Sequence, residues 1–146
     1  MNPDTTGRES IRFAGALYGI ENARTEAFVE EVSEFSGLGE FLELPTRTYS
    51  AGMRTRLGVS IVTGIRPDIL ILDEVLSTGD RAFRKKARER ILKLATSVKI
   101  LVLASHSLND IQEFCDRAIY LERGRVAFAG SCEEAWDLYL QRSSDL

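Results

Sequence analysis

Two adjacent carboxylates, Asp73 and Glu74, directly follow the apolar run 69–72 (Ile-Leu-Ile-Leu). A run of this kind predicts a strand buried on both faces, and open parallel sheets bind ligands at the carboxyl ends of their strands. One carboxylate placed there could hold a hydrated magnesium ion, and the next could orient or deprotonate an attacking water. The alternative is that the pair only begins a solvated loop.

The single histidine, His106, stands just beyond a second apolar run, 100–104. Its imidazole could donate a hydrogen bond to a phosphate or contact the water beside it. The alternative is a structural histidine that takes part only in helix-capping hydrogen bonds. The residues alone leave both interpretations open.

A third candidate is the small-residue segment Ser50-Ala51-Gly52, which precedes a predicted helix. It would offer an anion backbone N–H groups, a hydroxyl and the positive end of a helix dipole, while Gly52 would permit close approach of the backbone. An ordinary capped helix start is the alternative. A run of basic residues further along could likewise suggest phosphate or lipid head groups, but its spacing favours a solvated helix face. That run comprises Arg81, Arg84, Lys85, Lys86, Arg88, Arg90 and Lys93.

The composition is that of a cytoplasmic globular protein. The 146 residues are 44% hydrophobic and 28% charged, and the formal net charge of −3 argues against a general nucleic-acid binder. The two cysteines, Cys115 and Cys132, lack the spacing of a zinc site or a disulfide scaffold, so we expect free thiols. The chain shows neither an apolar stretch of about 18 residues nor a signal-peptide pattern at its start.

The elements that position these residues change in character near residue 48. Residues 1–48 predict a helical subdomain, with helices from Glu9 to Tyr18 and from Ala23 to Phe35, the second capped by Asn22. Residues 49–146 predict an α/β core that begins with a helix from Arg54 to about Thr63.

Within that core, Asp80 can cap a long helix that reaches about Thr96. Its apolar stripe comprises Phe83, Ala87, Ile91 and Leu94. A helix from about 108 to 115 and a hairpin of 118–121 with 126–128 follow the second strand, and Ser131 with Glu134 forms a capping-box pattern that opens a last helix. Strands that alternate with helices predict a parallel sheet.

The order of these signals resembles the nucleotide-binding domain of ABC transporters, which belongs to the P-loop NTPase fold. The resemblance places an L-S-G-G-Q-like signature at 49–53, a Walker B strand at 69–73, a D-loop at 77–80 and a switch histidine at His106. The segments 6–10 and 115–125 also match, so the resemblance covers nearly the whole chain. Within the family, it points to the subgroup that exports polysaccharides such as O-antigen or teichoic acid.

The chain departs from the family pattern in several places. Ala51 stands where glycine is usual, Met53 where glutamine is usual, and Val75 with Leu76 where many members have proline and threonine. The sequence contains no G-x-x-x-x-G-K-[ST] phosphate-binding loop, which implies that the chain matches only the back part of the domain. We therefore expect the isolated chain to hydrolyse ATP weakly or not at all.

The resemblance implies ATP and Mg²⁺ as cofactors and assigns roles residue by residue. Asp73 would hold magnesium through water, Glu74 would act as general base, and His106 would contact the γ-phosphate. The remaining cofactor-binding positions would be Ser50, Ala51, Gly52, Met53 and Asp80. The signature would act on ATP held by a partner's P-loop, and Asp80 would communicate across the dimer.

The implied partners are a second nucleotide-binding domain and a membrane-spanning permease, with no nucleic acid, at the cytoplasmic face of the inner membrane. Two other hypotheses are a non-enzymatic or regulatory remnant and an ATPase of DNA repair or chromosome organisation. The last would require a long coiled-coil insertion before the signature, and the sequence has none.

Overall fold

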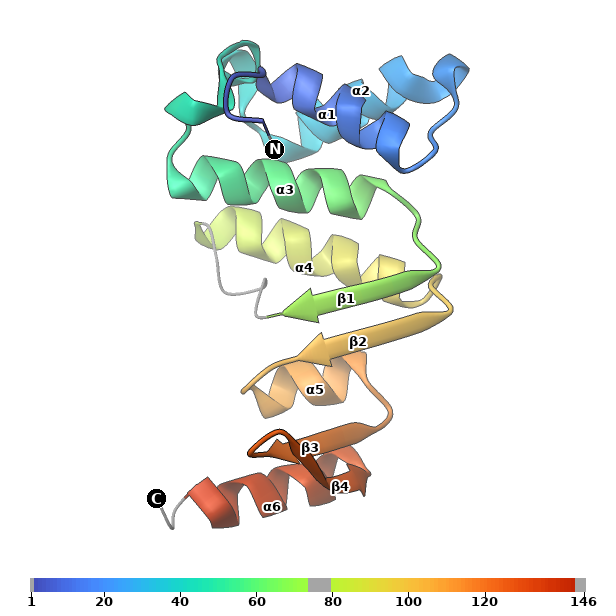
Figure 1. Cartoon of the computed structure of the whole chain (residues 1–146), viewed down its shortest axis with the longest axis vertical. Coiled ribbons are helices and arrows are strands. Elements are labelled where there is room, and N and C mark those ends of the chain that lie inside the picture. The colour runs from blue at the N-terminus through green and yellow to red at the C-terminus, as the bar shows by residue number, and fades with distance from the viewer. Residues whose placement is uncertain (1, 74–79, 144–146) are drawn as a thin grey trace. The chain divides into compact units, whose positions relative to one another are not determined.

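The computed structural model describes residues 2–73 and 80–143. By their internal contacts these residues form two compact units (Figure 1). One comprises Met1–Pro67 and Val75–Ser97, and the other comprises Asp68–Glu74 and Val98–Leu146, each apart from the residues not described. The subdivision into residues 1–48 and 49–146 stays a prediction.

The first unit is helical. It contains α1 (Gly7–Leu17), α2 (Asn22–Ser36), α3 (Ala51–Gly64) and α4 (Arg81–Ala95), with the short 3-10 turns Gly39–Glu43 and Thr46–Thr48 between α2 and α3. Helix α2 contacts both α1 and α3, and α3 also contacts α4. The main core comprises Ile11, Phe28, Val29, Val32, Leu38, Leu42, Tyr49, Leu57, Ile61 and Ile65. A second cluster of Phe35, Val59, Phe83 and Ala87 joins α4 to α2 and α3.

Local hydrogen bonds explain where the helices begin. Helix α1 starts at Gly7, two residues before the predicted Glu9, because Thr6 and Glu9 form a reciprocal capping box. These bonds stabilise the Glu9 carboxylate and lower its pKa. The prediction that Asn22 caps α2 is wrong: Asn22 is the first helical residue, and the preceding Glu21 makes no side-chain capping bond.

The second unit contains the strands. Strand β1 (Ile69–Asp73) pairs in parallel with β2 (Ile100–Ala104), and β3 (Ala118–Glu122) pairs antiparallel with β4 (Arg125–Gly130). The residues Arg123 and Gly124 between β3 and β4 both have positive φ, as a two-residue hairpin turn requires. Helices α5 (Leu108–Phe114) and α6 (Cys132–Ser143) follow β2 and β4. The α/β class with a helical lobe and a terminal hairpin is confirmed.

The prediction that the parallel strands are buried on both faces is wrong. In β1 the side chains of Leu70 and Leu72 are buried, whereas Ile69 is 54% exposed and Ile71 is 70% exposed. Strand β2 also alternates, with Ile100 and Val102 about half exposed, but Leu101 and Leu103 between and after them are only partly buried. An apolar run indicates that each of its side chains favours burial. Burial of the second face of a sheet also requires another element packed against that face, and the run does not show whether one is present.

None of the helices described is long and apolar enough to cross a membrane.

Candidate functional site

The predicted signature segment forms the beginning of α3. Ser50 has extended backbone angles and is the N-cap, and its Oγ accepts a hydrogen bond from the backbone N–H of Met53 at 3.2 Å. Ala51 and Gly52 are exposed, and Met53 packs against the main core. The first turn of α3 therefore presents a hydroxyl, backbone N–H groups and the positive end of a helix dipole to solvent, a combination that suits an anion.

Gly52 has no internal packing reason to be glycine. A Cβ built at this position would meet only Ser50 Oγ, at an ordinary 3.9 Å. A glycine within a helix costs about 1 kcal/mol relative to alanine. What the glycine provides is open space outside the chain, where a ligand could approach the backbone closely.

Tyr49, which directly precedes Ser50, holds the start of the segment in place. Its side chain is 3% exposed, and its hydroxyl donates a hydrogen bond to the carbonyl oxygen of Phe41 at 2.6 Å. Burial raises the pKa of this phenol. The guanidinium of Arg54 donates to the Tyr49 carbonyl oxygen. The backbone immediately before Ser50 is thus held on both sides, which fixes the direction in which α3 begins.

Asp80 caps α4, as predicted, and also contacts α3. Its Oδ1 accepts hydrogen bonds from the backbone N–H groups of Ala82 at 3.1 Å and Phe83 at 3.0 Å. Its Oδ2 forms an ion pair with Arg56 of α3, and the Arg56 guanidinium lies 5.1 Å from the centre of the Phe83 ring. Sequence reasoning missed Arg56, because no local pattern places α3 beside the start of α4. The role of Asp80 across a dimer stays a prediction.

We expect Asp80→Ala to lower the free energy of unfolding by about 1–2 kcal/mol, because both the cap and the ion pair are lost. Asp80→Asn keeps a capping oxygen but loses the charge, so its cost should be about half as large. Urea unfolding followed by circular dichroism measures both values. Equal losses for the two variants would show that the ion pair, not the cap, carries the stability.

The structure brings Asp73 and His106 to the same edge of the parallel sheet. Asp73 is the last residue of β1 and pairs with Ala104, the last residue of β2, two positions before His106. Both side chains are exposed. Parallel strands that end in register place their following residues together, which is the geometry expected of a ligand crevice. Glu74, the predicted general base, lies outside the described residues, as does the D-loop segment 77–79.

Residues 105–107 connect β2 to α5 and include the N-cap of that helix. Ser105 Oγ accepts from the backbone N–H of Ser107 at 3.1 Å, and Ser107 Oγ accepts from that of Asp110 at 3.4 Å, which caps α5. The capping residue is therefore Ser107. His106 borders a cavity of about 130 Å³ that is also lined by Trp136 and Tyr139 of α6.

Within the described chain, no group of three or more His, Cys, Asp or Glu side chains could hold a metal ion. A single carboxylate such as Asp73 fits Mg²⁺, which keeps several waters and takes its other ligands from phosphate oxygens.

The chain is similar to known ATP-binding proteins of bacterial export systems. No family model matches the chain. The chain is 39% identical over 141 residues to the O-antigen export system ATP-binding protein RfbB of Klebsiella pneumoniae, which covers 97% of the chain and 57% of that protein. It is 39% identical over 134 residues to the teichoic acids export ATP-binding protein TagH of Lactococcus lactis, covering 92% of the chain and 29% of that protein.

Two solved structures share the fold. An ATP-binding subunit of an ABC transporter superposes with a TM-score of 0.78 at 24% identity, covering 98% of the chain and 58% of that structure. A dimeric ATP-binding cassette in a post-hydrolysis state, bound to ADP and Pi, superposes with a TM-score of 0.69 at 21% identity over 89% of the chain and 58% of that structure. The chain spans little more than half the length of the K. pneumoniae relative. Over nearly all of its residues, it is a homologue of the O-antigen and teichoic acid export ATP-binding proteins of the ABC transporter family and has the fold of the matching part of an ABC ATPase domain.

Proposed function

We propose that this chain is part of the ATP-binding subunit of a cell-surface polysaccharide exporter, and that its signature turn binds the γ-phosphate of ATP held by the P-loop of a second nucleotide-binding domain. The observation that carries the proposal is the start of α3. Ser50 caps the helix. Gly52 leaves the backbone of the first turn accessible to a ligand, and no neighbouring atom of the chain requires glycine at this position. Relatives named for O-antigen and teichoic acid export support the choice of exporter.

The other site residues serve a nucleotide at the sheet edge. Asp73 would hold Mg²⁺ through water, Glu74 would accept a proton from the attacking water, and His106 would donate a hydrogen bond to the γ-phosphate. Bound MgATP supplies the phosphoryl group and the metal charge. Because the chain has no phosphate-binding loop, most of the positioning and charge stabilisation in phosphoryl transfer must come from elsewhere. The isolated chain should therefore hydrolyse ATP weakly or not at all.

The proposed partners follow from this arrangement. A second nucleotide-binding domain supplies the P-loop, and a dimeric cassette among the structural relatives supports such pairing. A membrane-spanning permease provides the path for the polysaccharide. The chain would then act at the cytoplasmic face of the inner membrane, attached through the permease.

The test is nucleotide-dependent association. The chain is mixed with a homologous nucleotide-binding domain that carries a P-loop, and complex formation is followed by sedimentation velocity with and without Mg²⁺ and a non-hydrolysable ATP analogue. We expect a complex that forms only with nucleotide. Gly52→Glu should weaken it by at least about a hundredfold, because like charges brought together cost several kcal/mol.

The free energy of unfolding of Gly52→Glu shows whether the variant still folds. An acidic side chain in the first turn of a helix is stabilised by the helix dipole, so its free energy of unfolding should be unchanged or slightly raised. Gly58→Ala changes another glycine of α3 at a site where a Cβ meets no atom within 4 Å, and should leave association unchanged. Association that is equally strong without nucleotide, or in Gly52→Glu, would instead favour a non-enzymatic interaction module.

A further inference from the structure

The two cysteines of the chain meet at the open end of the hairpin formed by β3 and β4. Cys115 lies three positions before the first residue of β3, and Cys132 lies two positions after the last residue of β4. The ladder ends with the pair Ala118 and Gly130, so the antiparallel register brings the segments beyond that pair close together. The thiol of Cys132 donates a hydrogen bond to the carbonyl oxygen of Cys115 at 3.3 Å.

This placement meets the geometric requirement for a disulfide. Residues that face each other across an antiparallel pair have Cα atoms about 5 Å apart, and a disulfide joins Cα atoms about 4.4–6.8 Å apart. Both cysteines are free thiols in the structure. The sequence contains only these two cysteines, so an intramolecular disulfide must join Cys115 to Cys132.

The two thiols differ in their surroundings. Cys132 is 8% exposed and lines the cavity of about 130 Å³ that His106 borders. This cavity has room for a molecule as small as hydrogen peroxide, since a water in the liquid takes up about 30 Å³. Cys115 is half-buried, and burial together with the neighbouring Cys132 and Asp116 raises the pKa of its thiol. Because the thiolate is the form that attacks an oxidant, Cys115 should react slowly near pH 7.

We propose that Cys132 and Cys115 form a reversible disulfide when the chain meets hydrogen peroxide, and that Cys132 is the attacking thiol. In the first step the Cys132 sulfur attacks one peroxide oxygen, the O–O bond breaks, and a sulfenic acid and a water are formed. In the second step the Cys115 sulfur attacks the sulfenic sulfur, the S–S bond forms, and the S–O bond breaks to release a second water. The two thiols supply both electrons and both protons that reduce the peroxide. This modification does not depend on the nucleotide function proposed above.

The disulfide would close a loop around the hairpin and attach the end of α5 to the start of α6. Cys115 is the C-cap of α5, and Cys132 is the first residue of α6. Helix α6 also supplies Trp136 and Tyr139 to the cavity beside His106. The bond would therefore hold one wall of that cavity in place. Trp136 is the single tryptophan of the sequence and lies about one turn after Cys132, so its fluorescence reports the change.

The experiment treats the whole 146-residue chain with hydrogen peroxide at pH 7. Mass spectrometry of its peptides identifies the bond, and a non-reducing gel separates intramolecular from intermolecular disulfides. We expect a monomer in which residues 115 and 132 lie in one linked peptide, and dithiothreitol should restore both thiols. The oxidised chain should show a changed Trp136 emission. Its melting temperature should rise by about 5 °C, because a closed loop restrains the unfolded chain.

Two serine variants test the order of the steps. Cys115→Ser removes the second thiol, so Cys132 should stop at the sulfenic acid, which dimedone traps as a stable adduct. Cys132→Ser removes the attacking thiol, so dimedone should label Cys115 at least about tenfold more slowly. Equal labelling of the two variants would overturn the assignment of Cys132 as the attacking thiol.

The matched control combines Cys132→Ser with Glu133→Cys. It keeps two cysteines at almost the same separation in the sequence, but moves one thiol to an exposed position of α6 that points in another direction. Intramolecular disulfide should fall to less than about a tenth of the wild-type yield under the same conditions. The proposal fails if peroxide leaves both wild-type thiols free, if only disulfides between two chains form, or if the control gives the wild-type yield.

Discussion

Gly7→Ala is expected to lower the free energy of unfolding of the helical unit by about 2–3 kcal/mol. A Cβ at position 7 would lie 2.2 Å from the Tyr49 hydroxyl oxygen and 3.2 Å from Leu42 Cα. The Tyr49 side chain cannot move aside easily, because it is buried and its hydroxyl is bonded to the Phe41 carbonyl. The Cβ would also lie 2.9 Å from Leu42 Cδ2, a side-chain atom that could move, but the contact with Leu42 Cα is with backbone, which cannot change rotamer. Either α1 shifts or Tyr49 leaves its site.

Gly58→Ala is a control variant for which the free energy of unfolding is expected to rise and not fall. Gly58 lies inside α3, and a Cβ there would meet no atom within 4 Å. Alanine has the higher helix propensity, so this variant should be more stable by up to about 1 kcal/mol. Urea unfolding followed by circular dichroism compares the two. If both substitutions changed stability in the same direction, the close approach of α1 to Tyr49 would not be what requires glycine at position 7.

The clash expected in Gly7→Ala should also affect the proposed site at the start of α3. Tyr49 directly precedes Ser50, and its burial fixes where α3 begins. A Gly7→Ala chain that still folds should therefore lose part of its nucleotide-dependent association, although position 7 is not a site residue. Gly58→Ala should retain it.

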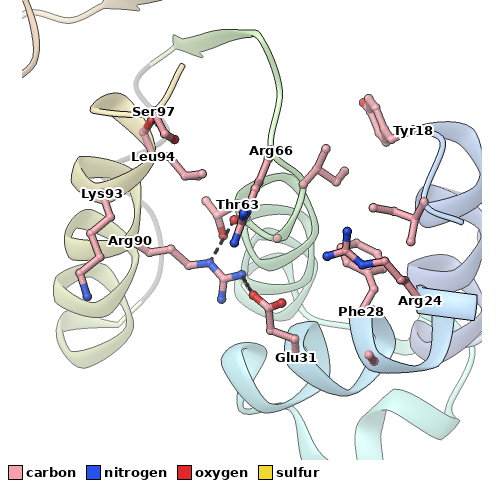
Figure 2. Close-up of a pocket in the computed structure, with 14 residues that line it drawn as sticks. Tyr18, Arg24, Phe28, Glu31, Thr63, Arg66, Arg90, Lys93, Leu94 and Ser97 are labelled. Atoms are coloured by element: carbon pink, nitrogen blue, oxygen red, sulfur yellow. Dashed lines mark hydrogen bonds and ion pairs between the residues drawn. The ribbon is translucent and has the colours of Figure 1, made fainter. Parts of the chain in front are cut away.

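Arg90→Ala is expected to cost about 2–3 kcal/mol, because one side chain joins three helices. Its Nε donates to the Thr63 carbonyl oxygen at 3.1 Å, and its Nη2 bonds to Glu31 of α2 (Figure 2). Its guanidinium also lies 4.3 Å from the centre of the Phe35 ring. Only 18% of the side chain is exposed, so these interactions are partly shielded from water.

Two further variants test this explanation of Arg90. Lys93→Ala removes a positive charge from an exposed position one turn further along α4, and should change stability by less than about 0.5 kcal/mol. Arg90→Lys keeps the charge but not the planar fork, so it should restore less than half of the loss. Thermal and urea unfolding give the values. Equal costs at positions 90 and 93 would mean that general charge, not the three contacts, stabilises α4.

Several features of the candidate site follow from residues that are close together in the sequence. Asp80 caps the helix that follows it, and Ser131 Oγ accepts from the backbone N–H of Glu134 at the start of α6, as their patterns predict. The apolar stripe of α4 is buried as its spacing predicts. The order of the signature, strand end and histidine predicts the family, and the homologues confirm it.

The sequence by itself determined the caps at Asp80 and Ser131, the apolar stripe of α4, the hairpin turn and the family resemblance, because each depends on residues within a few positions or on their order. Only the tertiary structure decided that Arg56 pairs with Asp80, that Tyr49 packs against Gly7, and that Arg24, Arg66 and Arg90 share one pocket. It also decided that one face of the parallel strands is exposed. These contacts join residues 24 to 66 positions apart, and local propensity carries no information on how helices pack at such separations.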